Sequence, residues 1–278
     1  MKHHVALSFD LDAIALWIGT FKATNVSTLS RGEFDAIGIP RILKLLQDRH
    51  IPATFFVPGH TALAFRSSVD EVVAAGHEIA HHGFVHERIT ELTPERELEV
   101  LRKGIEILSE VTGRRPVGYR SPSWDFTTHT TRYLLEHDFL YDSSMMATDF
   151  TPYWPRVDDQ ASADAPYVFG RQVPLVEIPV AWELGDAPHF LYVRGFTPGL
   201  RPANDVYDLW SEEYKFFRTR VPGGCYTLTL HPQISARGYR LMMLERLVDE
   251  MLADGATFST LETVARAWKA EQTEIPRR

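Results

Sequence analysis

The sequence predicts an α/β fold in which parallel strands are joined by helices. About six or seven short runs of β-branched and aromatic residues alternate with segments whose apolar residues recur at helical spacing. Strands that alternate with helices normally form a parallel sheet with helical crossovers. Polar side chains follow several of these strands directly, which is where α/β barrels place their chemistry. We therefore expect one functional site at the carboxyl edge of the strands.

Size and composition bound the class of protein. The chain has 278 residues, 44% apolar and 24% charged, which is enough to bury a large core in one domain spanning 1–278. A net charge of −8 without a basic run argues against a nucleic-acid partner. The single Cys225 excludes an internal disulfide. We see neither an apolar stretch of the roughly 20 residues that span a membrane nor a leader before Val5, so we expect a cytoplasmic protein.

The first half of the chain begins with a β-prone run at 5–9 that leads into Asp10 and Asp12. Residues 13–38 contain three glycines and several Ser and Thr residues, which favours an extended loop over the site. Pro40 is typical of a first helical position. The other predicted elements up to residue 137 are helices at 40–49, 63–75, 94–113 and 129–137, and strands at 53–57, 78–80 and 116–120.

The second half is interrupted by a segment rich in proline and aromatic residues at about 145–204. A loop this long inside a domain is usually functional or an interface, so we expect it to shape a substrate site or to join subunits of a homo-oligomer. A capping-box pattern, Ser259-x-x-Glu262, predicts the start of the last helix. The other elements predicted here are strands at 139–141, 173–180, 225–230 and 257–258, and helices at 206–219 and 241–252.

A pair of histidines four residues apart, His82 and His86, follows the apolar run at 78–80. Two imidazoles with a carboxylate form a common divalent-metal site that leaves a position open for water, and Asp12 can supply the carboxylate from a matching strand end. Alternation along the strand places Asp10 on the same side, where it can act as general base or as a second ligand. The plain alternative is two structural histidines in a chain that has 12.

Other strand-end residues can complete such a site. Arg120 is either a solvated guanidinium or a fork that holds Asp10 in position. His231, before Pro232, is suited to donate a proton to a leaving nitrogen. Trp124 is more often a core residue than a ligand contact, but an exposed indole would suit the flat face of a sugar or heterocycle.

These pieces, in this order, resemble the polysaccharide deacetylase family, the NodB-homology carbohydrate esterases. The likeness runs from Ser8 to about Pro232. The matching segments are Ser8-Phe9-Asp10-Leu11-Asp12, His82-Gly83-Phe84-Val85-His86, Arg120-Ser121-Pro122, Asp142-Ser143-Ser144 and Leu228-Thr229-Leu230-His231-Pro232.

The resemblance implies a distorted (β/α) barrel of about seven strands and hydrolysis of a non-peptide carbon–nitrogen bond. It implies Zn²⁺ or a related ion on Asp12, His82 and His86, and a backbone N–H near Ser123 that stabilises the oxyanion. By the same match Asp10 is the base, Arg120 its partner and His231 the acid. Either Asp142 or Asp149 is expected to tune His231.

The substrate is left open between two classes. The family implies removal of an N-acetyl group from a sugar. Ala13 departs from the usual glycine, and the run at 141–154 resembles an intracellular branch with cyclic-imide hydrolases, allantoinase-like enzymes and peptidoglycan deacetylases. Two other classes are a non-catalytic glycan-binding protein and a non-haem iron oxygenase, whose iron site also uses two His and one carboxylate. The oxygenase predicts many short strands, which the helical segments contradict.

Overall fold

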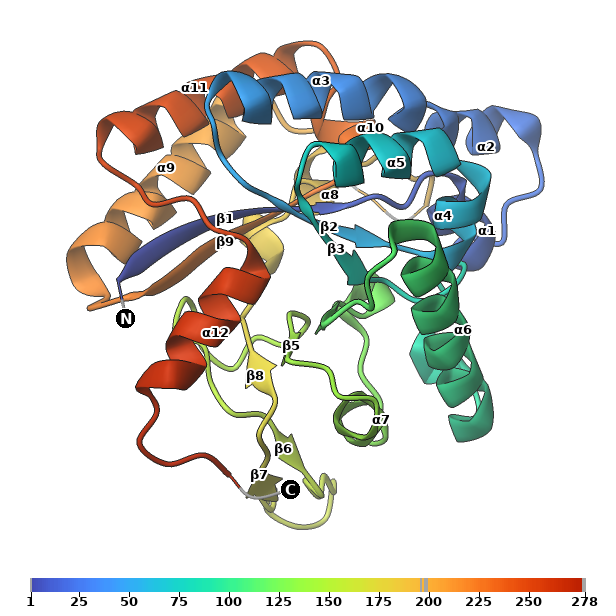
Figure 1. Ribbon diagram of the computed structural model, residues 1–278, viewed down its shortest axis with the longest axis vertical. Coiled ribbons are helices and arrows are strands. Elements are labelled where there is room, and N and C mark those ends of the chain that lie inside the picture. Colours follow the sequence, from blue (N-terminus) through green and yellow to red (C-terminus); the bar gives the residue numbers. More distant parts are fainter. Residues whose placement is uncertain (1, 196, 198–199, 277–278) are drawn as a thin grey trace.

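The computed structural model describes residues 2–195, 197 and 200–276, and its centre is a seven-stranded parallel sheet (Figure 1). The strand order is β8-β5-β4-β3-β2-β1-β9. The strands are β1 (His3–Asp10), β2 (Thr54–Val57), β3 (Glu78–His81), β4 (Gly118–Tyr119), β5 (Tyr141–Asp142), β8 (Val176–Glu177) and β9 (Gly224–Leu230). This architecture confirms the predicted α/β class and the distorted barrel of about seven strands.

The two outermost strands of the sheet, β8 and β9, are not paired as strands in the described part of the chain. A single parallel bridge between Gly185 and Thr229 connects the segment after β8 to β9. The barrel is therefore incomplete, and the segment that follows β8 occupies the gap near the carboxyl ends of the strands.

Helices surround the sheet. The longer ones are α2 (Val26–Glu33), α3 (Asp35–Asp48), α5 (Arg66–Ala74), α6 (Pro94–Thr112), α7 (Thr130–Glu136), α9 (Ala203–Arg220), α11 (Tyr239–Ala253) and α12 (Leu261–Glu271). The shorter ones are α1 (Ile14–Gly19), α4 (Gly59–Ala64), α8 (Ala187–Phe190), α10 (Pro232–Ser235), and three 3₁₀ turns, η1 (Ile89–Glu91), η2 (Pro122–Trp124) and η3 (Trp182–Leu184). A separate hairpin joins β6 (Arg156–Val157) to β7 (Arg171–Gln172).

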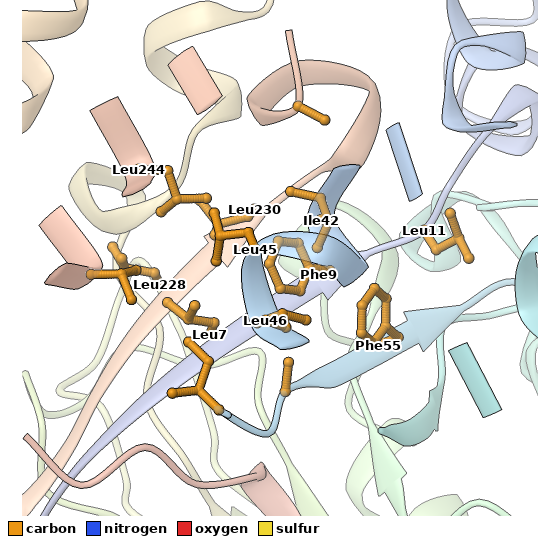
Figure 2. Close-up of a cluster of buried hydrophobic side chains, with 14 of the residues drawn as sticks. Leu7, Phe9, Leu11, Ile42, Leu45, Leu46, Phe55, Leu228, Leu230 and Leu244 are labelled. Carbon is orange, nitrogen blue, oxygen red and sulfur yellow. The ribbon is translucent and has the colours of Figure 1, made fainter. Parts of the chain in front are cut away.

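Strand β1 is buried on both faces, as expected for a central parallel strand. Its residues alternate: Leu7 and Phe9 belong to the outer core, whereas Ser8 and Asp10 point toward polar partners inside the barrel. Figure 2 shows the outer core, in which these side chains meet leucines of β9, α3 and α11. The labelled residues are Leu7, Phe9, Leu11, Ile42, Leu45, Leu46, Phe55, Leu228, Leu230 and Leu244.

A second cluster fills the barrel interior and extends to α12. Ala6, Phe56 and Ala80, from three neighbouring strands, belong to the same cluster as Leu261 and Val264 of α12. The polar site residues do not belong to this cluster; they lie at or just after the carboxyl ends of the strands.

The predicted extended loop at 13–38 is wrong, because this segment forms α1, α2 and the start of α3. Two of its glycines allow close backbone packing rather than a flexible loop. A Cβ on Gly19 would lie 1.7 Å from the Val85 carbonyl oxygen, and a Cβ on Gly32 would lie 2.4 Å from that of Ala13. Helix α3 likewise begins before the predicted start, and Pro40 lies inside it.

Helix ends were predicted with mixed success. Helix α6 is confirmed, with Thr93 accepting a hydrogen bond from the Arg96 N–H at its start. The predicted capping box at Ser259 is wrong. Thr260 caps α12 instead, while the Ser259 hydroxyl is bonded to His4. The predicted single helix at 63–75 is also wrong, because Phe65 is not helical and separates α4 from α5.

Candidate active site

The parallel sheet brings distant polar residues to one edge. Asp10 ends β1, Asp12 follows two residues later, His82 follows β3 and His231 follows β9. The shortest distances from Asp12 carboxylate oxygens are 3.4 Å to His82 Nε2 and 3.6 Å to both His86 Nε2 and His231 Nε2. Asp12 and the three histidines therefore lie close together in space, although they are spread over most of the sequence.

Asp12, His82 and His86 form a group that could hold a metal ion. Their ligand atoms lie within 4.8 Å of one another and all three residues are buried. Both Asp12 carboxylate oxygens and His82 Nε2 have no hydrogen-bond partner among the described residues. Donors that bind one tetrahedral ion at about 2.0–2.1 Å are about 3.4 Å apart, close to the separations seen here. The residues fit a divalent cation.

The protonation of the two imidazoles also suits a metal. Burial lowers the pKa of His82 to about 4 and that of His86 well below its ordinary value, so both rings are neutral at pH 7. His82 Nδ1 lies 2.8 Å from the Arg120 carbonyl oxygen and His86 Nδ1 lies 2.6 Å from the Thr20 hydroxyl. Because the Thr20 O–H donates to the His86 carbonyl, it accepts from Nδ1. Both Nε2 lone pairs are left for a ligand.

Asp12 is fully buried, and the charge of His231 compensates its carboxylate only in part. Burial raises the pKa of Asp12 well above its ordinary value, and the nearby Asp10 carboxylate adds to the effect. A bound cation would reverse this shift by stabilising the ionised form.

Asp10 is held by the fully buried Arg120. Arg120 Nη1 donates to Asp10 Oδ1 at 2.7 Å and to the Ser8 hydroxyl at 3.0 Å. Burial alone would raise the pKa of Asp10, but the charge and the hydrogen bond of Arg120, together with the charge of His231, hold it below its ordinary value. The predicted hold of Arg120 on Asp10 is confirmed, but through one nitrogen rather than through a fork. The other two nitrogens donate to the carbonyl and hydroxyl of Ser143 at 2.9 and 3.1 Å.

His231 is held by a carboxylate that the sequence did not reveal. Its Nδ1 lies 2.6 Å from Asp186 Oδ1, and its backbone N–H donates to Asp186 Oδ2 at 2.8 Å. Burial alone would lower the pKa of His231, but Asp186, Asp12 and Asp10 raise it to about 10. The expectation that Asp142 or Asp149 tunes His231 is wrong. Asp142 accepts from Ser144, and Asp149 is exposed on another cavity.

A cavity of about 480 Å³ opens over these groups. Asp10, His86 and His231 contribute to its floor, while Ser123 and Trp124 line it from η2. Its other wall comes from the predicted excursion at 145–204, through Trp182, Gly185, Ala187, Pro188, Leu191, Val193 and Thr197. The rings of Trp124 and Trp182 are 4.3 Å apart at their centroids, so the two walls contact each other at these indoles.

The backbone at η2 is unusual. Ser123 and Trp124 both have positive φ, at 57° and 56°, a conformation that non-glycine residues adopt rarely. The Trp124 N–H is bonded to the Ser121 carbonyl at 3.0 Å. Two strained residues in succession at a cavity wall are typical of a functional turn.

Two residues that contact the site were missed. Thr20 lay in the segment predicted as a loop, and nothing in its spacing connects it with His86. Asp186 lies 45 residues before His231, in the excursion, and the parallel bridge from Gly185 to Thr229 brings this segment beside β9.

Comparison with known proteins places this geometry in a family. The family model for polysaccharide deacetylase matches residues 27–141, which include His82, His86 and Arg120. A peptidoglycan deacetylase of Helicobacter pylori is 35% identical over 276 residues, covering 94% of each chain. This chain belongs to the polysaccharide deacetylase family. It is therefore a hydrolase of carbon–nitrogen bonds other than peptide bonds.

Solved structures agree with this membership. A structure from Mycobacterium smegmatis assigned to the polysaccharide deacetylases has a TM-score of 0.86 and 34% identity, covering 100% of this deacetylase and 93% of that chain. PuuE allantoinase has a TM-score of 0.77 at 23% identity over 98% of this chain and 91% of its own, which shows a shared fold. The oxygenase alternative is wrong, because a parallel barrel replaces the many short strands that it requires.

Membrane insertion has no support in the described helices, since none combines the length and the apolar character that a bilayer span demands.

Proposed function

We propose that this protein removes an N-acetyl group from an amino sugar of a glycan by metal-dependent hydrolysis. The observation that carries the proposal is the Asp12, His82 and His86 group with Asp10 and His231 beside it, at the floor of one cavity. The peptidoglycan deacetylase from Helicobacter pylori, 35% identical over nearly the whole chain, supports a glycan substrate.

Asp12, His82 and His86 would hold the ion, for which we propose Zn²⁺ because two imidazoles and one carboxylate suit it. When bound, such an ion polarises the amide carbonyl and lowers the pKa of water. Thr20 and the Arg120 carbonyl fix the two imidazoles in the orientation that binding needs.

Asp10 is the proton acceptor in this proposal. Arg120 keeps its carboxylate ionised and fixes one oxygen, while Oδ2 lies 4.0 Å from His231 Nε2. An ionised carboxylate at the cavity floor can take the proton from the attacking water.

His231 is the proton donor. Asp186 holds its ring through Nδ1, so Nε2 faces the cavity and carries the proton that the leaving nitrogen needs. Ser123 and Trp124 line the cavity wall. In this proposal the backbone N–H of Ser123 stabilises the tetrahedral oxyanion, and the Trp124 indole contacts the flat face of a sugar ring.

A second candidate substrate is a cyclic imide or ureide. The cavity favours it in one respect, because Leu16, Phe21, Leu191 and Val193 give it mainly apolar walls suited to a small ring. Ring opening would use the same floor residues in the same roles.

The test compares both substrate classes on one preparation. The zinc-loaded protein is assayed against N-acetylglucosamine oligomers beside succinimide, hydantoin and allantoin, with Asp10→Asn as the inactive control. Acetate release from the oligomers supports the proposal. Turnover of the ring compounds alone would show that the substrate is a cyclic imide or ureide rather than a glycan. If no compound is turned over and no metal is bound, both proposed functions are refuted.

A further inference from the structure

Two buried carboxyl groups oppose each other beneath the cavity. Asp142 ends β5 and Glu177 ends β8, and the two residues are paired in register on neighbouring strands. Both residues are 0% exposed. No ion pair to either side chain occurs in the described part of the chain, and the buried Arg120 donates to Asp10, Ser8 and Ser143 instead.

The hydrogen bonds account for one oxygen of each carboxyl. Glu177 Oε1 accepts from the backbone N–H groups of Ser144 and Met145, at 2.9 and 2.8 Å. Asp142 Oδ1 accepts from the Ser144 hydroxyl at 2.8 Å. Glu177 Oε2 and Asp142 Oδ2 are buried and receive no donor from the described residues, and the two carboxyl groups extend from residues paired in register on neighbouring strands.

Two ionised carboxylates in this position would repel each other away from bulk solvent, and both free oxygens would lack a donor from the described residues. One proton placed between them removes one charge and forms the missing hydrogen bond. Paired carboxyls at close range are known to hold a proton in this way.

We propose that Asp142 and Glu177 share one proton, and that the resulting pair is a positioning element for Arg120 and for the turn at Ser123.

The path from the pair to the site is short. The Ser144 hydroxyl, which donates to Asp142, accepts the Ser121 N–H at 2.9 Å. Ser121 precedes the strained turn at Ser123. The adjacent Ser143 accepts two hydrogen bonds from Arg120, which holds Asp10. The pair itself does not line the cavity, so it acts through these neighbours. This positioning role rests on the proposed function, whereas the shared proton does not.

The other charged or titratable groups around the pair do not replace the proton. Arg120 weakly lowers the pKa of Asp142, but burial is the larger effect and raises it to about 6. Burial and the Asp142 charge raise the pKa of Glu177 well above its ordinary value. The phenols of Tyr119 and Tyr153 face the pair, and burial raises the pKa of each, so both remain neutral.

Infrared spectroscopy tests the shared proton without any substrate. At pH 7 the wild type is expected to show a carboxylic-acid carbonyl band that is absent from Glu177→Gln, since the amide keeps the bonds to Ser144 and Met145 but carries no acid proton. Glu106→Gln, at an exposed position of α6, is the matched control and should leave the band unchanged. Identical wild-type and Glu177→Gln spectra would mean that both groups are ionised, and would overturn the proposal.

Kinetics and amide exchange test the positioning role. Glu177→Ala is expected to lower kcat by about 10- to 100-fold with little change in KM, because small displacements of catalytic groups have effects of that size. Glu177→Gln should restore kcat. Amide hydrogen exchange at Ser121 and Ser144 should accelerate in Glu177→Ala but not in Glu177→Gln.

Equal kcat losses in both variants, or unchanged exchange at Ser121, would refute the positioning role. If the wild type turns over none of the substrates, the proposed function fails. The infrared band still tests the shared proton, and the exchange rates still test whether the pair orders Ser121 and Ser144.

Discussion

Asp186 Oδ1 lies 2.6 Å from His231 Nδ1 and is the carboxylate that orients this imidazole. The same side chain also accepts from the His231 backbone N–H and from the Ser235 hydroxyl. The ring of His231, its own backbone and the last residue of α10 are thus held by one buried carboxylate from the excursion at 145–204.

Asp186→Asn is expected to reduce kcat by about 100-fold or more, within the range that a general acid contributes. The amide removes the negative charge that keeps His231 protonated, and it can hold the wrong tautomer. Steady-state kinetics measure the effect, with Asp149→Asn as control because that residue was the alternative candidate. Equal activity of Asp186→Asn and the wild type would remove Asp186 from the mechanism.

Asp10→Asn separates the proton acceptor from the metal group. We expect kcat to fall at least 100-fold while metal content, measured by elemental analysis, stays at the wild-type level. Asp12→Asn should instead lower metal content, because it removes a ligand. Loss of metal from Asp10→Asn would show that Asp10 is itself a ligand.

Thr20→Val tests the support of His86. The variant keeps the shape of the side chain but removes the acceptor for Nδ1, so metal affinity is expected to fall about 10- to 100-fold. A chelator competition assay measures it, and Thr24→Val, at an exposed position, serves as control. Equal affinities of the three proteins would contradict this role.

Ala13 follows Asp12 with φ 49° and ψ −130°, a region normally left to glycine. Asp35 accepts its N–H and Gln233 donates to its carbonyl, so the surroundings impose this conformation. Ala13→Gly should raise the free energy of unfolding by about 1 kcal/mol, since such strain costs about 1–3 kcal/mol. Denaturant unfolding measures it. Ala15→Gly, inside α1, should have the opposite sign.

Stability should fall on acidification because of His81. Burial lowers the pKa of His81 to about 3. Below pH 6.5, the ordinary pKa of histidine, the His81 imidazole is protonated in the unfolded chain but stays neutral in the folded chain. The stabilisation is therefore full above pH 6.5 and is lost toward pH 3, at up to about 1.4 kcal/mol per pH unit for this group. Urea unfolding of the metal-free wild type and of His81→Asn between pH 7 and 5 isolates this contribution, and equal slopes of the two proteins would contradict the assignment.

Much of the site was predictable because strand ends carry it. Asp10, Asp12, His82, Arg120 and His231 each follow a short apolar run, and parallel strands necessarily bring such positions to one edge. The same alternation turns His81 away from His82, and the His81 Nε2 lies 3.0 Å from the Leu101 carbonyl oxygen. The local sequence pattern was sufficient to predict a residue's place wherever side-chain alternation along a strand and the direction of that strand decide it.

What the sequence determined by itself was the parallel α/β order, the family, and the strand-end residues, since these depend on periodicity and motif spacing. Only the tertiary structure decided the partners of those residues: Asp186 for His231, Thr20 for His86, and Ser143 for Arg120. It also turned the glycine-rich segment after Asp12 into helices, because Gly19 and Gly32 allow backbones to approach closely. The physical reason is that such contacts join segments far apart in the chain, and no local spacing records which segments meet.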